Sequence, residues 1–257
     1  MPDKVRLSVV VIAKNEEKNI APCLGSVSGW AEEIIVFDDE STDDTARIAA
    51  KYADKVVSAK MDVEGDFRNR AYAQAKNSWV LSLDADEQVS EDLQKEIADC
   101  LAKNTPYAAF SIPLRNYIGN YWVRYGGWYP AGKVRLFRKD KFKYETVKVH
   151  PRVFIDGVCG HLTKDIIHKG YPDIAHFLDS LNRQTSWEAQ KWLNQQKPMR
   201  LVRFIWRTTD RFIRSYFVKQ GYKDGFIGFV VAYFAALYQF MSYLKYRELV
   251  LEKKNRK

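Results

Sequence analysis

The chain has 257 residues, 46% of them hydrophobic and 28% charged, a composition typical of a globular protein with a full hydrophobic core. Its net charge of +9 lies at one end: residues 1–195 carry 27 Lys and Arg against 28 Asp and Glu, whereas residues 196–257 carry 14 against 4. An anionic surface is therefore expected as a partner of the tail alone. Three scattered cysteines without a C-x-x-C pair argue against a disulfide framework or a zinc site, and favour a reducing compartment.

The first hundred residues alternate β-branched runs with helical patterns. Four runs predict strands: Leu7–Ile12, Glu33–Phe37, Lys55–Val57 and Trp79–Leu83. Apolar residues at helical spacing predict helices between them, near residues 20–27, 46–52 and 67–76, and a further helix near 91–103. Ser41 or Thr42 is the expected cap of the second helix. Strands alternating with helices indicate an α/β fold with a mostly parallel, Rossmann-like sheet and right-handed crossovers.

Polar residues follow three of these strands directly, at Lys14–Glu16, Asp38–Asp39 and Asp84–Asp86. Ligands of parallel sheets bind outside the carboxyl ends of the strands, so we expect the three segments to meet along one edge. The triplet Asp84-Ala85-Asp86 is the most informative of them, although a solvated acidic turn produces the same pattern often. Asp38 is placed to accept a base N–H or a ribose hydroxyl. The alternative role, a favourable charge at a helix N-terminus, suits Asp43 and Asp44 better.

Neither G-x-G-x-x-G nor G-x-x-x-x-G-K-[ST] occurs, so the usual dinucleotide and P-loop sites are absent from the sequence. Phosphates must be bound in another way, and a metal held by Asp84 and Asp86 is the expected route. Mg²⁺ and Mn²⁺ take carboxylate ligands together with substrate phosphates. Such an ion stabilises the charge that grows on a departing diphosphate.

The second half of the chain changes character. Residues 107–160 hold short β-like runs and an aromatic, glycine-rich stretch, Tyr117–Pro130, which predict a mixed-sheet extension with loops over the site. Residues 173–195 predict a helix. We therefore predict a catalytic domain at 1–197, with a nucleotide half at 1–105 and an acceptor half at 106–197. A basic, amphipathic helical tail follows at 198–257.

Four segments carry a family resemblance. They are S-V-V-V-I-A-K-N-E at 8–16, V-F-D-D-E-S-T-D-D-T at 36–45, R-N-R-A at 68–71 and W-V-L-S-L-D-A-D-E at 79–87. Together they resemble the nucleotide half of a family 2 glycosyltransferase of the GT-A fold. More narrowly, the chain is similar to the bacterial branch that adds a glucose-type sugar to the lipopolysaccharide core. The likeness continues through Gly127–Pro130, Arg135–Arg138 and His150 into the tail.

The resemblance implies an inverting, metal-dependent transfer of a hexose from a nucleotide sugar, expected to be UDP-linked, to a lipid-linked saccharide. The implied nucleoside pocket contains Ala13, Asn15, Glu16 and Asp38. Arg68 and Asn69 would reach the ribose or diphosphate, and the turn Asp84-Ala85-Asp86 would hold Mn²⁺ or Mg²⁺ and the diphosphate. The implied donor and acceptor cleft contains Trp128, Tyr129, Arg135 and Arg138. Each has a structural alternative: Arg68 as a solvated helix residue, for example, or Trp128 as core packing.

One position departs from the resemblance. Relatives carry His-Glu where this chain has His150-Pro151, and that glutamate is the expected general base. His150 is the first candidate to replace it and Glu145 the second, with Asp156 and Asp165 further off. A catalytically silent sugar-nucleotide-binding or membrane adaptor protein is the alternative function. His168 is either a ligand of the metal or diphosphate or a hydrogen-bonded histidine at a strand end.

The tail carries arginines at spacings of three and four, which place them along one helical stripe: Arg200, Arg203, Arg207, Arg211 and Arg214. Most apolar residues of the segment fall on the other side. This pattern favours the headgroup boundary of an anionic bilayer. Together with the family resemblance, it leads us to expect the protein at the cytoplasmic side of the inner membrane. A helix packed on the catalytic domain with solvated arginines is the alternative, and nucleic acid is not an expected partner. Residues 226–244 carry no formal charge, so they predict a membrane-lying helical hairpin or, as second choice, a single span.

Overall fold

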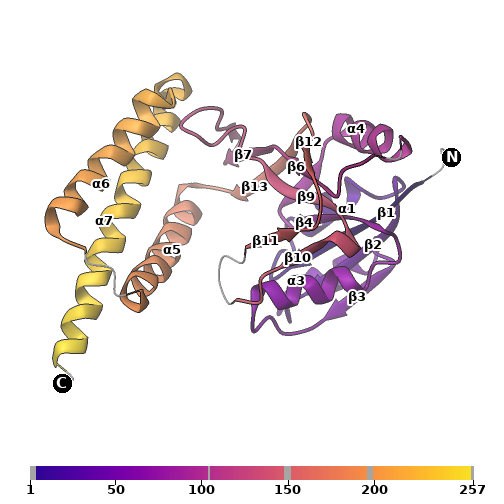
Figure 1. Ribbon diagram of the computed structural model, residues 1–257, viewed down its shortest axis with the longest axis horizontal. Helices are drawn as coiled ribbons and strands as arrows, with labels where there is room; N and C mark the ends of the chain where they lie inside the picture. Colours follow the sequence, from indigo (N-terminus) through magenta and orange to yellow (C-terminus); the bar gives the residue numbers. More distant parts are fainter. Residues whose placement is uncertain (1–3, 104, 148–151, 196–198, 256–257) are drawn as a thin grey trace. The chain divides into compact units, whose positions relative to one another are not determined.

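The computed structural model describes residues 4–103, 105–147, 152–195 and 199–255 (Figure 1). The chain forms two compact units, one of residues 1–114 and 132–168 and the other of residues 115–131 and 169–257. The boundary between them is therefore not the one predicted at residue 198. The helix that precedes this residue packs with the helices that follow it, so it belongs to the second unit.

The first unit is built on a seven-stranded sheet in the order β12-β6-β9-β4-β1-β2-β3. The strands β1 (Val5–Ala13), β2 (Ala31–Asp38), β3 (Lys55–Ser58) and β4 (Trp79–Asp84) run parallel and contain all four predicted runs. The sheet continues through β9 (Lys133–Arg138), which is antiparallel to both β4 and β6 (Ala109–Ile112), and through β12 (Cys159–His161). This mostly parallel sheet confirms the predicted fold class.

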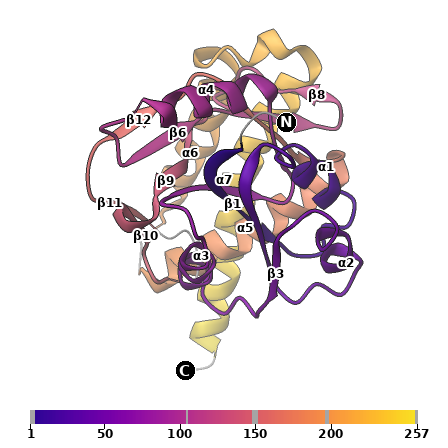
Figure 2. The ribbon, with the colours of Figure 1, turned by 90° about the vertical axis from the view of Figure 1, so that its right-hand side faces the viewer.

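Both faces of the sheet are covered, as the β-branched runs predict. Side chains alternate along β1, so that Val9 and Val11 enter one core and Val10 the other. The first core packs against the helices α1 (Ile20–Gly25), α2 (Thr45–Ala49) and α4 (Glu91–Ala102). The second packs against α3 (Glu64–Ala73), and the helices can be followed around the sheet in Figure 2. Helix α2 begins after Asp44, so neither Ser41 nor Thr42 is its cap.

Two smaller pairings complete the first unit. The strands β10 (Phe142–Tyr144) and β11 (Val153–Ile155) form an antiparallel pair after the short 3₁₀ turn Lys139–Lys141. Strand β5 (Glu87–Val89), which follows the acidic turn, pairs with the first three residues of β13 (Ile166–Tyr171). This second pairing matters for the site, because it sets His168 opposite Glu87.

The second unit consists of helices and one hairpin. The helices are α5 (Ile174–Asn194), α6 (Leu201–Ile213) and α7 (Gly225–Asn255), with a π-helical turn at Arg214–Val218 and a 3₁₀ turn at Gly221–Asp224 between α6 and α7. The hairpin is formed by β7 (Leu114–Ile118) and β8 (Tyr121–Trp122). Buried residues of α5 recur every three or four positions, from Phe177 to Trp192, and this stripe packs along α7. Helix α6 lies beside α7, so the two form a helical hairpin (Figure 1).

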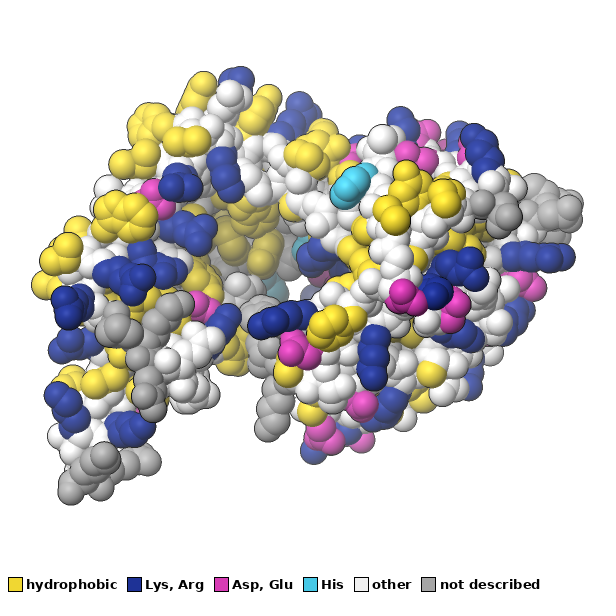
Figure 3. All heavy atoms as spheres, viewed as in Figure 1, with side chains coloured by type: hydrophobic (Ala, Val, Ile, Leu, Met, Phe, Trp, Pro, Cys, Tyr) yellow, Lys and Arg dark blue, Asp and Glu magenta, His cyan; other side chains and the backbone are white. Residues whose placement is uncertain are grey.

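Helix α6 exposes its most apolar side. None of its residues is fully buried, and Val202 and Trp206 are 79% and 62% exposed. Phe204 instead packs on α7, where its ring stacks on Tyr243 at 4.2 Å between centroids. The arginines lie beside the apolar stripe, and Figure 3 shows Lys and Arg side chains in a row over α6 with hydrophobic side chains next to them. More exposed apolar side chains follow at the turn and the start of α7: Phe217, Val218, Tyr222 and Phe226.

The turn between α6 and α7 depends on close backbone approach at two glycines. A Cβ at Gly228 would lie 1.8 Å from the carbonyl oxygen of Gly221, and one at Gly221 would lie 2.7 Å from that of Ser215. Asp224 in the same turn is buried and accepts hydrogen bonds from the amides of Arg124 and Tyr125, at 3.0 and 2.8 Å. The turn therefore also holds the loop that follows β8.

We expect Gly228→Ala to lower the free energy of unfolding by about 1–3 kcal/mol, because the new methyl group forces the backbone of the turn apart. Gly25→Ala is the matched control, since nothing lies within 4 Å of a Cβ at that helical position. Urea unfolding followed by circular dichroism measures both. An equal stability of the two variants would contradict the close packing of this turn.

Candidate functional site

The carboxyl ends of three parallel strands meet at one edge of the sheet. The register sets Ala13 of β1 opposite Asp38 of β2, and Ile12 opposite Asp84 of β4. The amide of Ala85 donates to the carbonyl of Ile12 at 3.1 Å. The structure thus brings together the three polar segments for which the sequence predicts a common edge.

Two loops at this edge are joined through Asn15 and Glu16. The backbone N–H of Asn15 donates to Ser41 Oγ at 2.8 Å, and the side-chain Oδ1 of Asn15 accepts from the backbone N–H of Thr42 at 2.9 Å. The Glu16 amide donates to Thr45 Oγ1 at 2.7 Å. Asn15 has a φ of 53°, in the left-handed region that asparagine tolerates better than most residues. These contacts hold the loops after β1 and β2 together beside Asp38.

Asp38 retains one unused acceptor. Its side chain is 1% exposed, Oδ2 accepts from the Ser41 amide at 2.9 Å, and Oδ1 is buried with no hydrogen-bond partner among the described residues. The neighbouring Asp39 differs, because Lys14 Nζ at 2.8 Å and the Met61 amide at 2.7 Å occupy both of its oxygens. A buried acceptor without a partner is costly unless a ligand supplies a donor. Asp38 therefore keeps an acceptor that a ligand could use, whereas both oxygens of Asp39 are occupied by contacts within the protein.

Asp84 and Glu87 share one buried arginine. Arg135 of β9 donates through Nη2 to Asp84 Oδ2 at 2.6 Å and to Glu87 Oε1, and Arg68 of α3 donates to Asp84 Oδ1 at 2.9 Å. Glu87 Oε2 accepts in turn from the Asp84 amide at 2.9 Å. Arg68 is largely buried, so its interpretation as a solvated helix residue is wrong. Its Nη1 is buried without a partner among the described residues.

The two carboxyl groups respond differently to this environment. Burial by itself would raise the pKa of Asp84, but Arg135 and Arg68 hold it far below its usual value, so Asp84 is a carboxylate. Burial, with the charge of Asp84, raises the pKa of Glu87 even though Arg135 opposes this. Together the two acids and two arginines form a dense ionic cluster below the acidic turn.

Asp86 is paired with His168 instead. The distance from His168 Nε2 to Asp86 Oδ2 is 3.1 Å, and both side chains are about one fifth exposed. Burial alone would lower the pKa of His168, but the hydrogen bond and the charge of Asp86, together with Glu87, raise it. Glu16 lies close enough to feel the same charges: burial and the carboxylates Asp86, Asp43 and Asp84 raise its pKa, although Asn19 partly opposes this.

The predicted metal ligands Asp84, Asp86 and His168 therefore do not form one ligand set. Asp86 and His168 present a carboxylate oxygen and an imidazole nitrogen on the same side of the acidic turn, whereas both oxygens of Asp84 are taken by arginines. Within the described ranges, no three Asp, Glu, His or Cys side chains are grouped as a metal cluster. The donor set fits a cation that takes two protein ligands and completes its shell from a substrate diphosphate.

Glycosyl transferase family 2 is the family whose sequence profile matches residues 8–162. An uncharacterized glycosyltransferase of Rickettsia typhi is 30% identical over 97% of this chain and 89% of its own length. The chain belongs to glycosyl transferase family 2. The lipopolysaccharide core biosynthesis glycosyltransferase LpsC of Rhizobium meliloti is 25% identical over 95% of this chain and 93% of its own length.

The fold agrees with this assignment. The crystal structure of Staphylococcus aureus TarS residues 1–349 in complex with UDP superposes with a TM-score of 0.50 at 16% identity, covering 98% of this chain and 92% of that one. At this identity the similarity shows the shared glycosyltransferase fold, which includes the mostly parallel sheet described above.

In this family 2 glycosyltransferase, three implied site residues have other contacts than expected. Asn69 uses both ends of its amide on the backbone of Tyr144, at 2.9 Å each, so it fixes β10. Arg138 lies opposite Trp79 at the amino end of β4, away from Asp84, and pairs with Asp140 at 3.5 Å. Arg135 is instead a buried partner of the acidic turn. Its spacing from Arg138 along β9 does not indicate that it faces this turn.

Trp128 and Tyr129 belong to the second unit. Trp128 packs edge-on against Phe177 at 5.6 Å between centroids, and Tyr129 against Trp122 at 5.3 Å. The mixed-sheet extension predicted for residues 107–160 is confirmed in part: β6 and β9 extend the main sheet and β7 and β8 form a hairpin, whereas Trp128 packs against a helix residue.

The candidates for the general base are divided by the structure. His150 and Pro151 lie outside the described residues. Glu145 is described; its Oε2 accepts from the Arg152 amide at 3.3 Å, and its side chain is partly exposed. Asp156 is exposed and pairs with Lys141 at 2.6 Å.

Two site residues were missed by sequence reasoning. Glu87 is bound to both ends of the acidic turn. Its position three residues after Asp84 is the sequence feature that could have identified it. Tyr144 lies under Arg68, with the guanidinium carbon 5.8 Å from its ring centroid, and burial next to Tyr72 raises its pKa to about 12. No local pattern marks Tyr144, because it reaches the site from a different strand.

We expect Arg135→Met to lower the free energy of unfolding by about 3–5 kcal/mol, because it leaves two carboxylates without their buried partner. Arg47→Met removes the exposed pair with Asp44 and should change the free energy of unfolding far less, because solvent screens that pair. Chemical denaturation of both variants gives the comparison. Equal losses would mean that Arg135 is not the arginine on which the turn depends.

Proposed function

We propose that this glycosyltransferase moves a hexose from a UDP-sugar to a saccharide of the lipopolysaccharide core or another lipid-linked acceptor. The observation that carries the proposal is the arrangement at one sheet edge: the unused acceptor of Asp38, and the pair Asp86–His168 on the neighbouring turn. One side suits a nucleoside and the other a diphosphate with its cation. The likeness to LpsC supports the choice of acceptor.

Asp38 is the proposed nucleoside ligand. Its buried Oδ1 would accept an N–H of the base or a ribose hydroxyl, and the joined loops at Asn15 and Glu16 would form the walls. TarS, which has the same fold, was solved with UDP, and this is compatible with a uridine donor here.

Asp86 and His168 are the proposed ligands of Mn²⁺ or Mg²⁺. The ion, when bound, would offset the charge on the departing diphosphate. The chain contributes a second positive group, since Nη1 of Arg68, which has no partner among the described residues, would donate to a diphosphate oxygen. Arg68 and Arg135 keep Asp84 ionised and oriented, so Asp84 would act by positioning the turn. A proton must also leave the attacking hydroxyl, and His150 and then Glu145 remain the proposed acceptors.

The second unit supports attachment to a membrane. A soluble helix normally turns its apolar stripe inward, but α6 exposes Val202, Ile205 and Trp206 and keeps arginines beside them. Such a helix suits the headgroup boundary of an anionic bilayer. Residues 221–255 are long and apolar enough to cross a membrane by length and composition, yet α5 and α6 pack along this helix. We therefore favour a helical hairpin lying on the cytoplasmic side over a single span.

Asp86→Ala should reduce the release of UDP from UDP-glucose with Mn²⁺ by about 100-fold or more, because the diphosphate loses its cation. Asp62→Ala is the control, since that carboxylate is exposed and pairs only with Lys60, at 3.6 Å, among the described residues.

His168→Gln should weaken Mn²⁺ binding in the presence of UDP, measured by calorimetry. Full activity of Asp86→Ala would refute the metal assignment. Donor binding without turnover, with lipopolysaccharide core acceptor present, would favour the silent adaptor suggested by Pro151.

The membrane proposal is tested by Val202→Glu combined with Trp206→Glu. Two apolar side chains that would enter the bilayer become charged, so sedimentation with phosphatidylglycerol vesicles should fall by about tenfold or more. Val158→Glu is the matched control, because Val158 is also an exposed apolar residue, at 63%, but belongs to the first unit. Equal sedimentation of the two proteins would rule out α6 as the membrane surface.

A further inference from the structure

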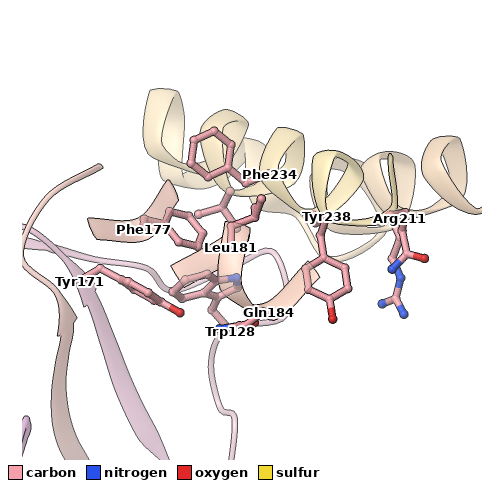
Figure 4. Close-up of a pocket in the computed structure, with 11 residues that line it drawn as sticks. Trp128, Tyr171, Phe177, Leu181, Gln184, Arg211, Phe234 and Tyr238 are labelled. Carbon is pink, nitrogen blue, oxygen red and sulfur yellow. The ribbon is translucent and has the colours of Figure 1, made fainter. Parts of the chain in front are cut away.

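The second unit contains an aromatic cavity of about 300 Å³ between α5 and α7 (Figure 4). Its inner wall is apolar and is formed by Phe177 and Leu181 of α5 and by Val231 and Phe234 of α7, with Trp128 across from them. Its polar lining is formed by Tyr171, Gln184, Gln239, Tyr238 and Arg211, and the last two mark one end of the cavity. Figure 4 shows Tyr238 and Arg211 at that end, their side chains extending side by side from the helices.

A basic hollow of about 330 Å³ adjoins this end. Four arginines of one helical stripe line it, namely Arg203, Arg207, Arg211 and Arg214. Asp210 balances the charge of Arg214, at 2.7 Å, whereas Arg207 donates to the neutral Gln239 Oε1 at 2.9 Å. No described carboxylate lies within ion-pair distance of Arg203 or Arg211. The hollow, which Trp206 and Asp210 also line, therefore carries an excess of positive charge that suits an anion.

Arg211 lines both the cavity and the hollow, which makes them two parts of one site. Guanidinium groups bind phosphate through charge-assisted, often bidentate, hydrogen bonds. The cavity offers aromatic and aliphatic surface of the kind that encloses small apolar ligands. A free phosphate would not fill the apolar cavity, and an uncharged alkyl ligand would not pair with the arginines.

We propose that this site binds a phosphorylated lipid, with the phosphate on the arginines around Arg211 and an acyl chain in the aromatic cavity. The proposal rests on the proposed function and deepens it, because it assigns a lipid-phosphate subsite to the unit proposed to lie on the membrane. Two sources share this chemistry: a phosphodiester phospholipid of the bilayer, and a phosphomonoester on the lipid anchor of the acceptor. No part of the site belongs to the donor edge, since every lining residue is in the second unit.

The test is isothermal calorimetry of the full chain with octyl phosphate below its micellar concentration, compared with octanol and with inorganic phosphate. We expect octyl phosphate to bind at least about tenfold more tightly than either part alone. Arg211→Gln should weaken octyl phosphate about tenfold and leave octanol unchanged. Ala235→Phe, which fills the cavity, should weaken octyl phosphate and octanol alike. The controls are Arg247→Gln and Leu251→Phe, exposed positions of α7 outside the site.

Octyl phosphate that binds no better than inorganic phosphate would overturn the proposal, as would equal effects of Arg211→Gln and Arg247→Gln. Dihexanoyl phosphatidylglycerol distinguishes the sources: tighter binding of this diester indicates a bilayer lipid, and tighter binding of octyl phosphate indicates the acceptor. Asp86→Ala should bind octyl phosphate as the unchanged chain does. Loss of glycosyl transfer and loss of lipid binding are therefore separate results.

Discussion

The pairing of Arg135 with Asp84 and Glu87 is the interaction on which the site depends. Asp84 ends β4 and Glu87 begins β5, so a single buried guanidinium holds both ends of the acidic turn. Such a cluster tolerates no loss of one partner, because the remaining charges would be buried alone. Asp86, between the two ends, is left to face His168. The shape of the turn is thus set by the protein before any ligand arrives, which is what a preorganised site requires.

The sheet and its functional edge could be predicted because the information is local. Continuous β-branched runs identify buried strands, and carboxylates directly after them must lie at the carboxyl edge of a parallel sheet. The roles within the acidic turn could not be predicted in the same way. Arg135 arrives on β9 and His168 on β13, and no periodicity reports which side chain of a distant strand will face a given carboxylate. The sequence therefore predicted Asp84, Asp86 and His168 as metal ligands, whereas the structure pairs Asp86 with His168 and binds Asp84 to two arginines.

The helical unit illustrates a second limit. The apolar stripe of α5 predicts that one face of the helix is buried, but it does not identify the surface that covers it. The covering surface is α7, and this moves the unit boundary away from residue 198. In α6 the pattern left two orientations open, an apolar face toward a bilayer or one packed on the catalytic domain, and the structure leaves the apolar stripe exposed. Phe204, the apolar residue that breaks the pattern, makes the contact with α7.

In the proposed function, the exposed apolar stripe of α6 and the lipid site serve one physical purpose. An acceptor anchored in a bilayer moves in two dimensions, so an enzyme held on the same surface meets it at a raised effective concentration. Exposed apolar side chains of α6 would hold the enzyme there without a span, and the arginine stripe beside them would be drawn to anionic headgroups. Because the same stripe borders the aromatic cavity, a lipid that leaves the bilayer along it would keep its phosphate paired while its chain moves from one apolar environment to another. Binding would then require little desolvation beyond what the membrane surface has already imposed.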